Sequence, residues 1–469
     1  MQRIILHLDM NSYFASVEQQ ANPFYRGKPL GVCATMTRNG CIIASSKEAK
    51  KEGIKVGCRV QDARAIDPNV ILVEVDPPKY RSTTEKIFSI LAEYSEDIEP
   101  YSIDEAFVNL TGFVADFDAA SELGRRIKQR ILGEVGEWLT CSMGIAATRW
   151  LAKFGADTCE KGGLVVLTAD MLDAYLTGRE LTEAWGIADR TAAKLMDLGI
   201  RDLLELKRYP VANLIQSFGM RGYELWANLN AIELSRVQTP RPPKSVGHSH
   251  VLRRRTNDQR FHEAVLLKLC EKTGRRLRSL DMEAGALWCG FGTTLGILGE
   301  RNPANAGGFS LPTPPVSEGV LGLGSRETRS PRTDFFGESV RLPDRTADTR
   351  VLFRTALDIF RREHMTGIPS FFAVYTFDLA PVSRQLSLFG KPRTSSSLSS
   401  ERCGAGPKDY GLQKALDEIN DRYGEYVIVP GSMLGLAGHH VPDRIGYRKT
   451  VGWDITGIDP VREPLLIYE

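Results

Sequence analysis

The first residues of the chain pass from an apolar run to a helical spacing, which predicts a strand followed directly by a helix. RIILHLDM is apolar and ends in an acid, as a buried strand would. In NSYFASVEQQ, which comes next, Phe14 and Val17 stand at a helical spacing. Asn11 and Ser12 precede them as candidate N-caps. Asp9 is therefore expected where the strand meets the helix.

Short apolar runs continue as far as residue 168. KPLGVCAT, GCIIASS, AFVNLTG and TCSMGIAAT each predict a short strand. KEAKKEGIKVG predicts a short helix that ends at Gly53. Strands mixed with helices indicate an α/β or α+β region over residues 1–168.

The pattern then becomes helical, and linkers divide the rest of the chain. LTEAWGIADRTAAKLMDLGIRDLLEL predicts a helix, a tight turn with glycine and a second helix, and SFGMRGYELW is a weaker copy of the turn. TPRPPKS, residues 239–245, is Pro-rich and basic, which is typical of a linker. A further domain extends to residue 380, and its Gly-, Pro- and Ser-rich stretch 299–335 predicts a flexible insertion. After a second linker, 391–408, the tail opens with the amphipathic stretch YGLQKALDEINDRYG.

Composition narrows the class of protein. With 469 residues, of which 42% are apolar and 25% charged, the chain is expected to form several soluble domains. Its eight scattered cysteines include no C-x-x-C pair, which argues against a zinc site and favours a reducing cytoplasm. The chain has neither an apolar run of membrane-spanning length nor the pattern of a signal peptide, so a cytoplasmic protein without membrane contact is expected.

Two adjacent acids, Asp104 and Glu105, precede the strand AFVNL, although neighbours on a strand point to opposite faces. Alone, either acid is most simply a solvated strand end. Together with Asp9 they favour a site for two Mg²⁺ ions, which prefer carboxylate oxygens and clamp both oxygens of a phosphoryl transfer. Asp104 is then expected to bridge both ions while Glu105 binds one.

LDMNSYFASVE together with YSIDEAFVNLTG resembles the Y-family translesion DNA polymerases, which include DNA polymerase IV (DinB) and the UmuC subunit of DNA polymerase V. The resemblance covers the chain to about residue 390. It implies an α+β multidomain fold shaped as a right hand, and a bacterial DNA-directed DNA polymerase that copies damaged DNA by two-metal nucleotidyl transfer without proofreading. The implied parts are the palm, 1–25 and 76–168; the fingers, 26–75; the helical thumb, 169–238; the linker, 239–245; the little finger, 246–380; a clamp-binding peptide, 384–390; and the tail, 409–469.

The resemblance also assigns roles within the site. Asp9, Asp104 and Glu105 become the catalytic carboxylates, and with the Met10 carbonyl they would bind two Mg²⁺ ions. Phe14 becomes the steric gate that excludes a 2′-hydroxyl, whereas its spacing alone favours a core residue.

The triphosphate residues depart from the family pattern. Lys47 stands where the family has Tyr and Lys50 where it has Arg, and a lysine cannot form Arg's two-pronged bond to phosphate. Glu160 occupies the position of a family lysine, and Lys161 follows it. The expected nucleotide-binding residues are Tyr13, Lys47, Lys50, Lys153 and Lys161.

WGIADRTAAKLMDLGI resembles a helix-hairpin-helix, whose backbone amides bind DNA phosphates, with its hairpin at Gly186. Bases outnumber acids over residues 241–280, which favours a phosphate-tracking surface over a merely solvated face. The bases are Arg241, Lys244, Arg253, Arg254, Arg255, Arg260, Lys268, Lys272, Arg275, Arg276 and Arg278.

RQLSLFG matches the bacterial sliding-clamp-binding peptide, with the binding residues Gln385, Leu386, Leu388 and Phe389. The expected partners are primer-template DNA, deoxynucleoside triphosphates and the clamp, with UmuD-like or recombinase proteins as further candidates. Two other functions stay open: a weakly catalytic or non-catalytic accessory protein that binds clamp and DNA, which the altered lysines suggest, and a nucleotide cyclase with a palm-like site.

Overall fold

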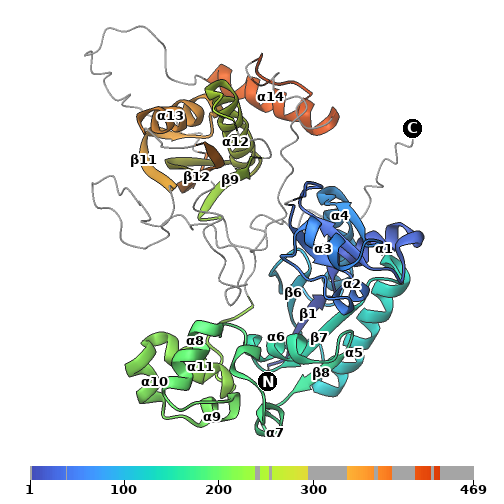
Figure 1. The fold of residues 1–469 in the computed structure, drawn as a ribbon. Coiled ribbons are helices and arrows are strands. Elements are labelled where there is room, and N and C mark those ends of the chain that lie inside the picture. Colours follow the sequence, from blue (N-terminus) through green and yellow to red (C-terminus); the bar gives the residue numbers. More distant parts are fainter. Residues whose placement is uncertain are drawn as a thin grey trace. The chain divides into compact units, whose positions relative to one another are not determined.

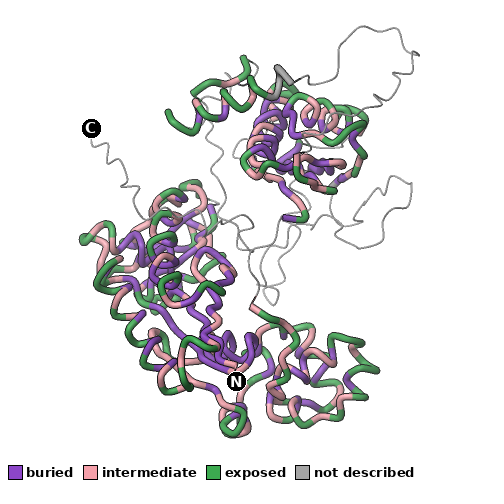
Figure 2. The backbone as a smooth tube through the Cα atoms, turned by 180° about the vertical axis from the view of Figure 1, so that it is seen from behind, coloured by how far each residue is buried: buried purple, intermediate pink, exposed green. Residues whose placement is uncertain are grey.

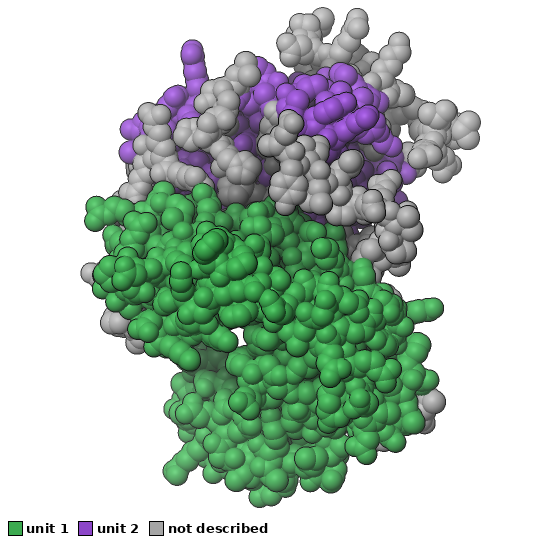
Figure 3. All heavy atoms as spheres, turned by 90° about the vertical axis from the view of Figure 1, so that its right-hand side faces the viewer, with its two compact units in different colours: residues 1–241, 443–469 green, residues 242–442 purple. Residues whose placement is uncertain are grey.

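The structure is a computed structural model that describes residues 3–38, 40–237, 243–252, 256–293, 335–363, 368–382, 407–423, 427–431 and 433 (Figure 1). The chain divides into two compact units, which are coloured separately in Figure 3. Unit 1 comprises residues 1–241 and 443–469 and contains the paired acids, and unit 2 comprises residues 242–442. In the described part of the chain, no helix is both long and apolar enough to cross a membrane.

Unit 1 is built around a five-stranded sheet. Its strands, in spatial order, are β5 (Ile98–Pro100), β6 (Glu105–Asn109), β1 (Ile5–Met10), β7 (Cys141–Ala146) and β8 (Leu164–Leu167). β1 lies at the centre, antiparallel to both β6 and β7. Figure 2 shows buried residues gathered in the interior of this unit.

Helices cover both faces of this sheet. Alternate side chains of β1 point to opposite faces, and each set belongs to a different apolar cluster. Leu6 and Leu8 belong to one apolar cluster and Ile5 to another. The helices are α1 (Tyr13–Ala21), α4 (Pro77–Ala92), α5 (Phe117–Arg130) with its π-helical extension Ile131–Val135, and α6 (Arg149–Thr158). α6 lies so close to β7 that a Cβ on Gly144 would stand 2.0 Å from the Ala152 carbonyl oxygen, so only glycine fits there.

The strand and helix predicted at the start of the chain are present as β1 and α1, but the expected cap is not. Ser12 occupies the N-cap position with φ of 50°, and its side chain makes no capping bond. Its hydroxyl instead accepts a hydrogen bond from Lys50 Nζ at 2.7 Å.

A small three-stranded sheet follows α1. Its order is β3 (Ile42–Ser45), β2 (Leu30–Cys33) and β4 (Ile71–Glu74), after the 3-10 turn Pro23–Tyr25 and beside α2 (Lys47–Lys51) and α3 (Val60–Ile66). Ser46 caps α2 by accepting a hydrogen bond from the Ala49 amide at 3.2 Å. Gly53, with φ of 88°, follows the end of this helix, as its sequence predicts.

The helical region contains α7 (Leu172–Leu176), the 3-10 turn η3 (Leu181–Glu183), α8 (Asp189–Asp197), α9 (Leu203–Arg208), α10 (Val211–Phe218) and α11 (Met220–Leu229). The predicted stretch 181–206 contains a helix, a glycine turn and a helix, as α8, Gly199 with φ of 84° and α9. Directly before Gly186 the chain forms only η3, so a full helix on that side of the hairpin predicted at Gly186 is absent. α10 and α11 meet at Gly219, where the weaker copy of the turn is predicted.

Unit 2 is a four-stranded antiparallel sheet with helices. The strand order is β11 (Phe335–Thr346), β10 (Met282–Thr293), β12 (Pro369–Pro381) and β9 (Ser245–Val251), and α12 (Gln259–Ser279) and α13 (Thr349–Arg362) share one apolar core with it. The predicted insertion 299–335 lies outside the described residues except for its last residue, which begins β11.

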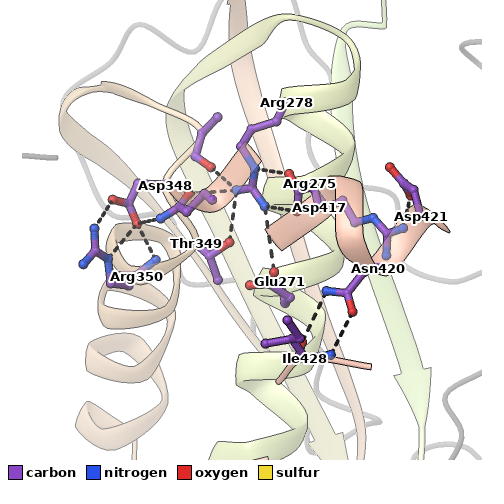
Figure 4. Close-up of polar contacts among 12 residues, drawn as sticks. Glu271, Arg275, Arg278, Asp348, Thr349, Arg350, Asp417, Asn420, Asp421 and Ile428 are labelled. Atoms are coloured by element: carbon purple, nitrogen blue, oxygen red, sulfur yellow. Dashed lines mark hydrogen bonds and ion pairs between the residues drawn. The ribbon is translucent and has the colours of Figure 1, made fainter. Parts of the chain in front are cut away.

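The amphipathic stretch of the tail forms α14 (Pro407–Tyr423), and this helix docks on unit 2 through polar groups (Figure 4). The Arg278 guanidinium, on α12, donates to both carboxylate oxygens of Asp417 at 2.6 and 2.9 Å. Gln413 donates to Asp348 Oδ1 at 2.8 Å. The tail helix is therefore part of unit 2.

Candidate active site

The fold of unit 1 brings the three predicted acids to one end of the central strands. Asp9 in β1 lies directly opposite Glu105, the first residue of β6. The Met10 amide donates to the Asp104 carbonyl at 3.0 Å and ties the bend before β6 to the end of β1. Residues about a hundred positions apart in the sequence therefore share one edge of the sheet.

Of the three acids, Glu105 is the one whose negative charge is balanced by a neighbouring cation. Its Oε2 accepts a hydrogen bond from Lys153 Nζ at 2.6 Å and lies 3.3 Å from His7 Nε2. Burial acts to raise its pKa, but His7 and Lys153 outweigh burial and hold the pKa of Glu105 down, at about 2. Glu105 is therefore ionised at neutral pH.

Asp104 and Asp9 have no such cation. Ser102 Oγ donates to Asp104 Oδ1, yet burial raises the pKa of Asp104 to about 6. Burial, followed by the charges of Asp104 and Glu105, raises the pKa of Asp9 to about 8. The protein itself therefore supplies too little positive charge to keep both of these acids ionised, and a bound cation would favour their charged forms.

Sequence reasoning missed His7. It lies two residues before Asp9 on the same face of β1, is fully buried, and its ring packs 4.4 Å from that of Phe107. Burial lowers the pKa of His7, so the imidazole beside Glu105 is neutral. The strand's two-residue period carries the signal that could have placed His7 beside the acids.

The predicted gate lies at the edge of the same core. Phe14 is 8% exposed, and its ring stacks on Tyr80 with centroids 4.5 Å apart. Tyr13 is buried and donates its hydroxyl to the Tyr80 carbonyl at 2.8 Å. The Tyr13 hydroxyl is therefore hydrogen-bonded inside the protein.

The five predicted nucleotide-binding residues do not form one group. Lys50 Nζ bonds Ser12 at the start of α1, and burial and the charge of Lys161 lower its pKa. Lys47 Nζ instead lies over the Trp138 ring, 5.7 Å from its centroid. Lys153 is only 7% exposed and binds Glu105. Lys153 thus binds one of the acids, Lys50 interacts electrostatically with both Asp9 and Lys161, and Lys47 contacts Trp138 instead.

No three His, Cys, Asp or Glu side chains within the described ranges are grouped as a ready-made metal cage. The acids that could hold a cation are nonetheless adjacent at the ends of β1 and β6. Their oxygen donors and excess negative charge suit a hard divalent cation.

The predicted DNA-binding residues divide into three groups. Gly186 has φ of 97°, and its carbonyl accepts a hydrogen bond from Arg221 Nη2 at 3.2 Å; Lys244 is exposed. Arg253, Arg254 and Arg255 lie outside the described residues, as do Gln385, Leu386, Leu388 and Phe389 of the clamp peptide.

The prediction of a basic surface over residues 241–280 is wrong in part. Lys268, Lys272 and Arg278 are only 5–6% exposed, so they cannot follow a DNA backbone at the surface. Arg278 binds α14 instead. Counting charges along a helix does not reveal which of its faces is buried.

Comparison with known proteins defines the family. The sequence profile of the impB/mucB/samB family matches residues 8–157, and that of its C-terminal domain matches residues 243–388. DNA polymerase IV of Listeria innocua is 31% identical over 279 residues, which cover 60% of this chain and 78% of that protein. DNA polymerase IV of Pelotomaculum thermopropionicum is 34% identical over 58% of this chain and 68% of that protein.

Solved structures agree on the fold. A Y-family DNA polymerase chimera, Dbh-Dpo4(243-245)-Dbh, covers 80% of this chain and 98% of its own, with a TM-score of 0.63 and 23% identity. The chain therefore shares its fold with a Y-family polymerase, the family whose fold the acid motifs predict. The chain therefore belongs to the impB/mucB/samB family, the Y-family DNA polymerases.

Proposed function

We propose that this DNA-directed DNA polymerase performs translesion synthesis, adding deoxynucleotides opposite damaged template bases with two Mg²⁺ ions and without proofreading. The observation that carries the proposal is the meeting of Asp9, Asp104 and Glu105 at one edge of the sheet. The relatives named DNA polymerase IV and a solved insertion ternary complex of Dbh DNA polymerase support it.

The donor set suits two divalent cations. Burial raises the pKa of both Asp9 and Asp104, which is the expected property of carboxylates that gain from a nearby positive charge. Asp9, Asp104, Glu105 and the Met10 carbonyl would hold the ions. When bound, Mg²⁺ would activate the primer 3′-hydroxyl and neutralise charge on the reacting phosphate.

The remaining residues position the nucleotide. Lys50, on α2 and bonded to Ser12 before α1, is proposed to meet the triphosphate together with Lys161, and each acts as a point charge. Phe14 is proposed to pack against the sugar, supported from behind by the Tyr80 ring. The buried acids and the stacked ring together would select and orient a deoxynucleotide.

Primer extension with Mg²⁺ on undamaged and abasic templates tests this function. The wild type should extend both primers, and Asp104→Ala should lower the rate by about 10³-fold or more. A wild type that binds DNA but extends neither primer would identify an accessory protein instead. Extension that survives Asp104→Ala would refute the site.

The gate has its own test. Phe14→Ala should raise the ratio of ribonucleotide to deoxynucleotide incorporation by about 10-fold or more, since a ring that blocks the 2′-hydroxyl is lost. Phe24→Ala is the matched control, because Phe24 is 81% exposed just beyond α1. An unchanged ratio in Phe14→Ala would remove the gate role.

The clamp peptide is proposed as a separate binding segment. Deleting residues 385–389 should abolish stimulation by the sliding clamp while leaving extension without the clamp intact. Retained stimulation would show that the clamp binds elsewhere.

A further inference from the structure

Helix α6 places two cations one turn apart against the acid-bearing strand β6. Arg149 begins the helix, and its guanidinium makes a two-pronged ion pair with Glu99 at 2.9 and 2.8 Å. The same guanidinium lies 3.9 Å from the centre of the Phe107 ring. Lys153, one turn later, reaches Glu105.

Aromatic rings surround both cations, and one ring comes from the helical region. Trp185 lies 5.6 Å from Arg149 Cζ and 5.8 Å from Lys153 Nζ, measured to the ring centre. Tyr101 meets the edge of Trp185 at 5.7 Å and lies 5.7 Å from Lys153 Nζ. The Lys153 ammonium is therefore bordered by two rings that favour a cation on their faces.

The backbone at Trp185 is fixed to α6 as well. The Trp150 indole donates to the Trp185 carbonyl at 3.1 Å. Trp185 directly precedes Gly186, the glycine of the predicted DNA-binding hairpin. One residue thus joins the hairpin to the helix that carries Lys153.

Lys153 holds a single oxygen of Glu105. Its ammonium contacts Glu105 Oε2 at 2.6 Å and Asp157 Oδ1 at 3.2 Å, whereas Glu105 Oε1 lies toward Ser102 at 3.5 Å. Fixing Oε2 leaves Oε1 on the side of Asp104, where a cation would need it. A lysine free to swing would not keep this orientation.

We propose that Trp185 is a positioning residue for the polymerase reaction: its ring confines Lys153, so that Lys153 holds Glu105 in the orientation that binds a metal ion. The inference rests on the proposed function of the acids. It predicts that a residue next to the DNA-binding hairpin changes the metal requirement while every charge in the site is kept.

The test compares Trp185→Ala with Trp185→Phe in the full chain. Mn²⁺ titration without DNA, followed by electron paramagnetic resonance, should show an affinity about 3- to 10-fold weaker for Trp185→Ala, below the 10–100-fold cost of losing a direct partner of a metal ligand. The Mg²⁺ concentration that gives half-maximal primer extension should rise by the same factor. Trp185→Phe, which keeps a ring, should stay within twofold of the wild type.

Two further arms separate positioning from ordinary packing. Trp226→Ala removes a tryptophan of the same apolar cluster, on α11, and should leave the Mn²⁺ affinity within twofold. In a Lys153→Gln background, adding Trp185→Ala should change the Mn²⁺ affinity by less than twofold, because the ring acts through the lysine.

Several results would overturn the inference. One is an unchanged metal affinity in Trp185→Ala, and another is an equal loss with and without Lys153. Weaker DNA binding in EDTA with an unchanged metal requirement would make Trp185 part of the hairpin packing alone. Failure of the wild type to extend any primer would instead refute the proposed function.

Discussion

Two clusters of charged side chains in this molecule differ in whether the protein itself neutralises them. In unit 2 the side chain of Arg278 is 3% exposed, and Asp417, the Ala347 carbonyl and Thr349 Oγ1 all accept its hydrogen bonds (Figure 4). In unit 1, Asp9 and Asp104 are half-buried at one edge of the sheet, and the Lys153 ammonium beside them is bound to Glu105. The first cluster is neutralised by the protein and the second is not.

The difference separates a structural role from a functional one. A buried ion with complete partners fixes how elements pack, here α14 on α12, because moving either partner would leave a charge unpaired. Carboxylates that lie away from water without a cation lower the stability of the folded protein. They can, however, bind cations from solution, which is a reason for a protein to retain them.

The largest effect is expected in the balanced cluster. Asp417→Ala leaves the Arg278 guanidinium buried without its main partner, so unit 2 should lose about 3–5 kcal/mol of unfolding free energy. Urea unfolding of the full chain, with hydrogen exchange followed at α12, measures the loss. The double variant Arg278→Leu with Asp417→Leu should recover most of it, since no charge is then left alone. A loss below 1 kcal/mol in Asp417→Ala would contradict the balance described above.

The unbalanced cluster should respond with the opposite sign. Asp9→Asn removes a carboxyl whose ionisation burial and two neighbouring acids disfavour in the folded state, so at neutral pH the metal-free protein should gain about 1–3 kcal/mol of unfolding free energy. Thermal unfolding in EDTA measures the gain. Adding Mg²⁺ should stabilise the wild type more than the variant, because a ligand that binds the folded state stabilises it. A destabilised Asp9→Asn would mean that the ionised carboxylate is compensated after all.

The same cluster predicts a pH dependence. Between the ordinary value of 3.8 and about 6 for Asp104, or about 8 for Asp9, the folded protein binds more protons than the unfolded chain. These two acids should therefore make the stability of the metal-free protein fall as pH rises, by at most about 1.4 kcal/mol per pH unit for each proton. The lowered pKa of Glu105 acts in the other direction below its ordinary value of 4.5, and the lowered pKa values of His7 and His262 do so below 6.5, so the fall should be clearest between pH 6.5 and 8.

Thermal unfolding in EDTA across that range tests this pH dependence. Asp9→Asn should flatten the upper part of the profile, above about pH 6.5, where Asp9 is the one of the two acids that still titrates. A profile equally steep in the variant would assign the pH dependence to other groups.

The smallest effect is expected at the rim of the balanced cluster. Asp421 pairs with Arg275, but its side chain is 66% exposed, so Asp421→Ala should cost less than about 1 kcal/mol. The same urea unfolding experiment measures it beside Asp417→Ala. A cost equal to that of Asp417→Ala would mean that burial does not distinguish the two acids.

Local patterns predicted the elements of the site, because strand and helix periods are properties of neighbouring residues. β1, α1 and the acids before β6 are present where their sequences indicate. The partnership of Glu105 with Lys153 was not predicted, since it joins residues 48 positions apart through the packing of α6 on the sheet. A family resemblance directed Lys153 toward the nucleotide, and tertiary contact directs it to the acid.

The tail helix α14 shows a second limit of prediction from local sequence patterns. Its amphipathic pattern predicted a helix, but the buried positions Asp417 and Asn420 are polar and Leu412 is 58% exposed. Hydrophobic periodicity predicts that a helix forms. It predicts the wrong buried face when the helix packs through ion pairs and not through apolar side chains. Only the buried Arg278 of a distant helix explains the arrangement.

The ion pair between Arg278 and Asp417 also sets an order of events during synthesis. The two residues are 139 positions apart. At roughly 5–20 residues per second, the ribosome needs on the order of ten seconds to supply the acid after the base. Until then the guanidinium has to stay hydrated, so unit 2 matures only after α14 has been made.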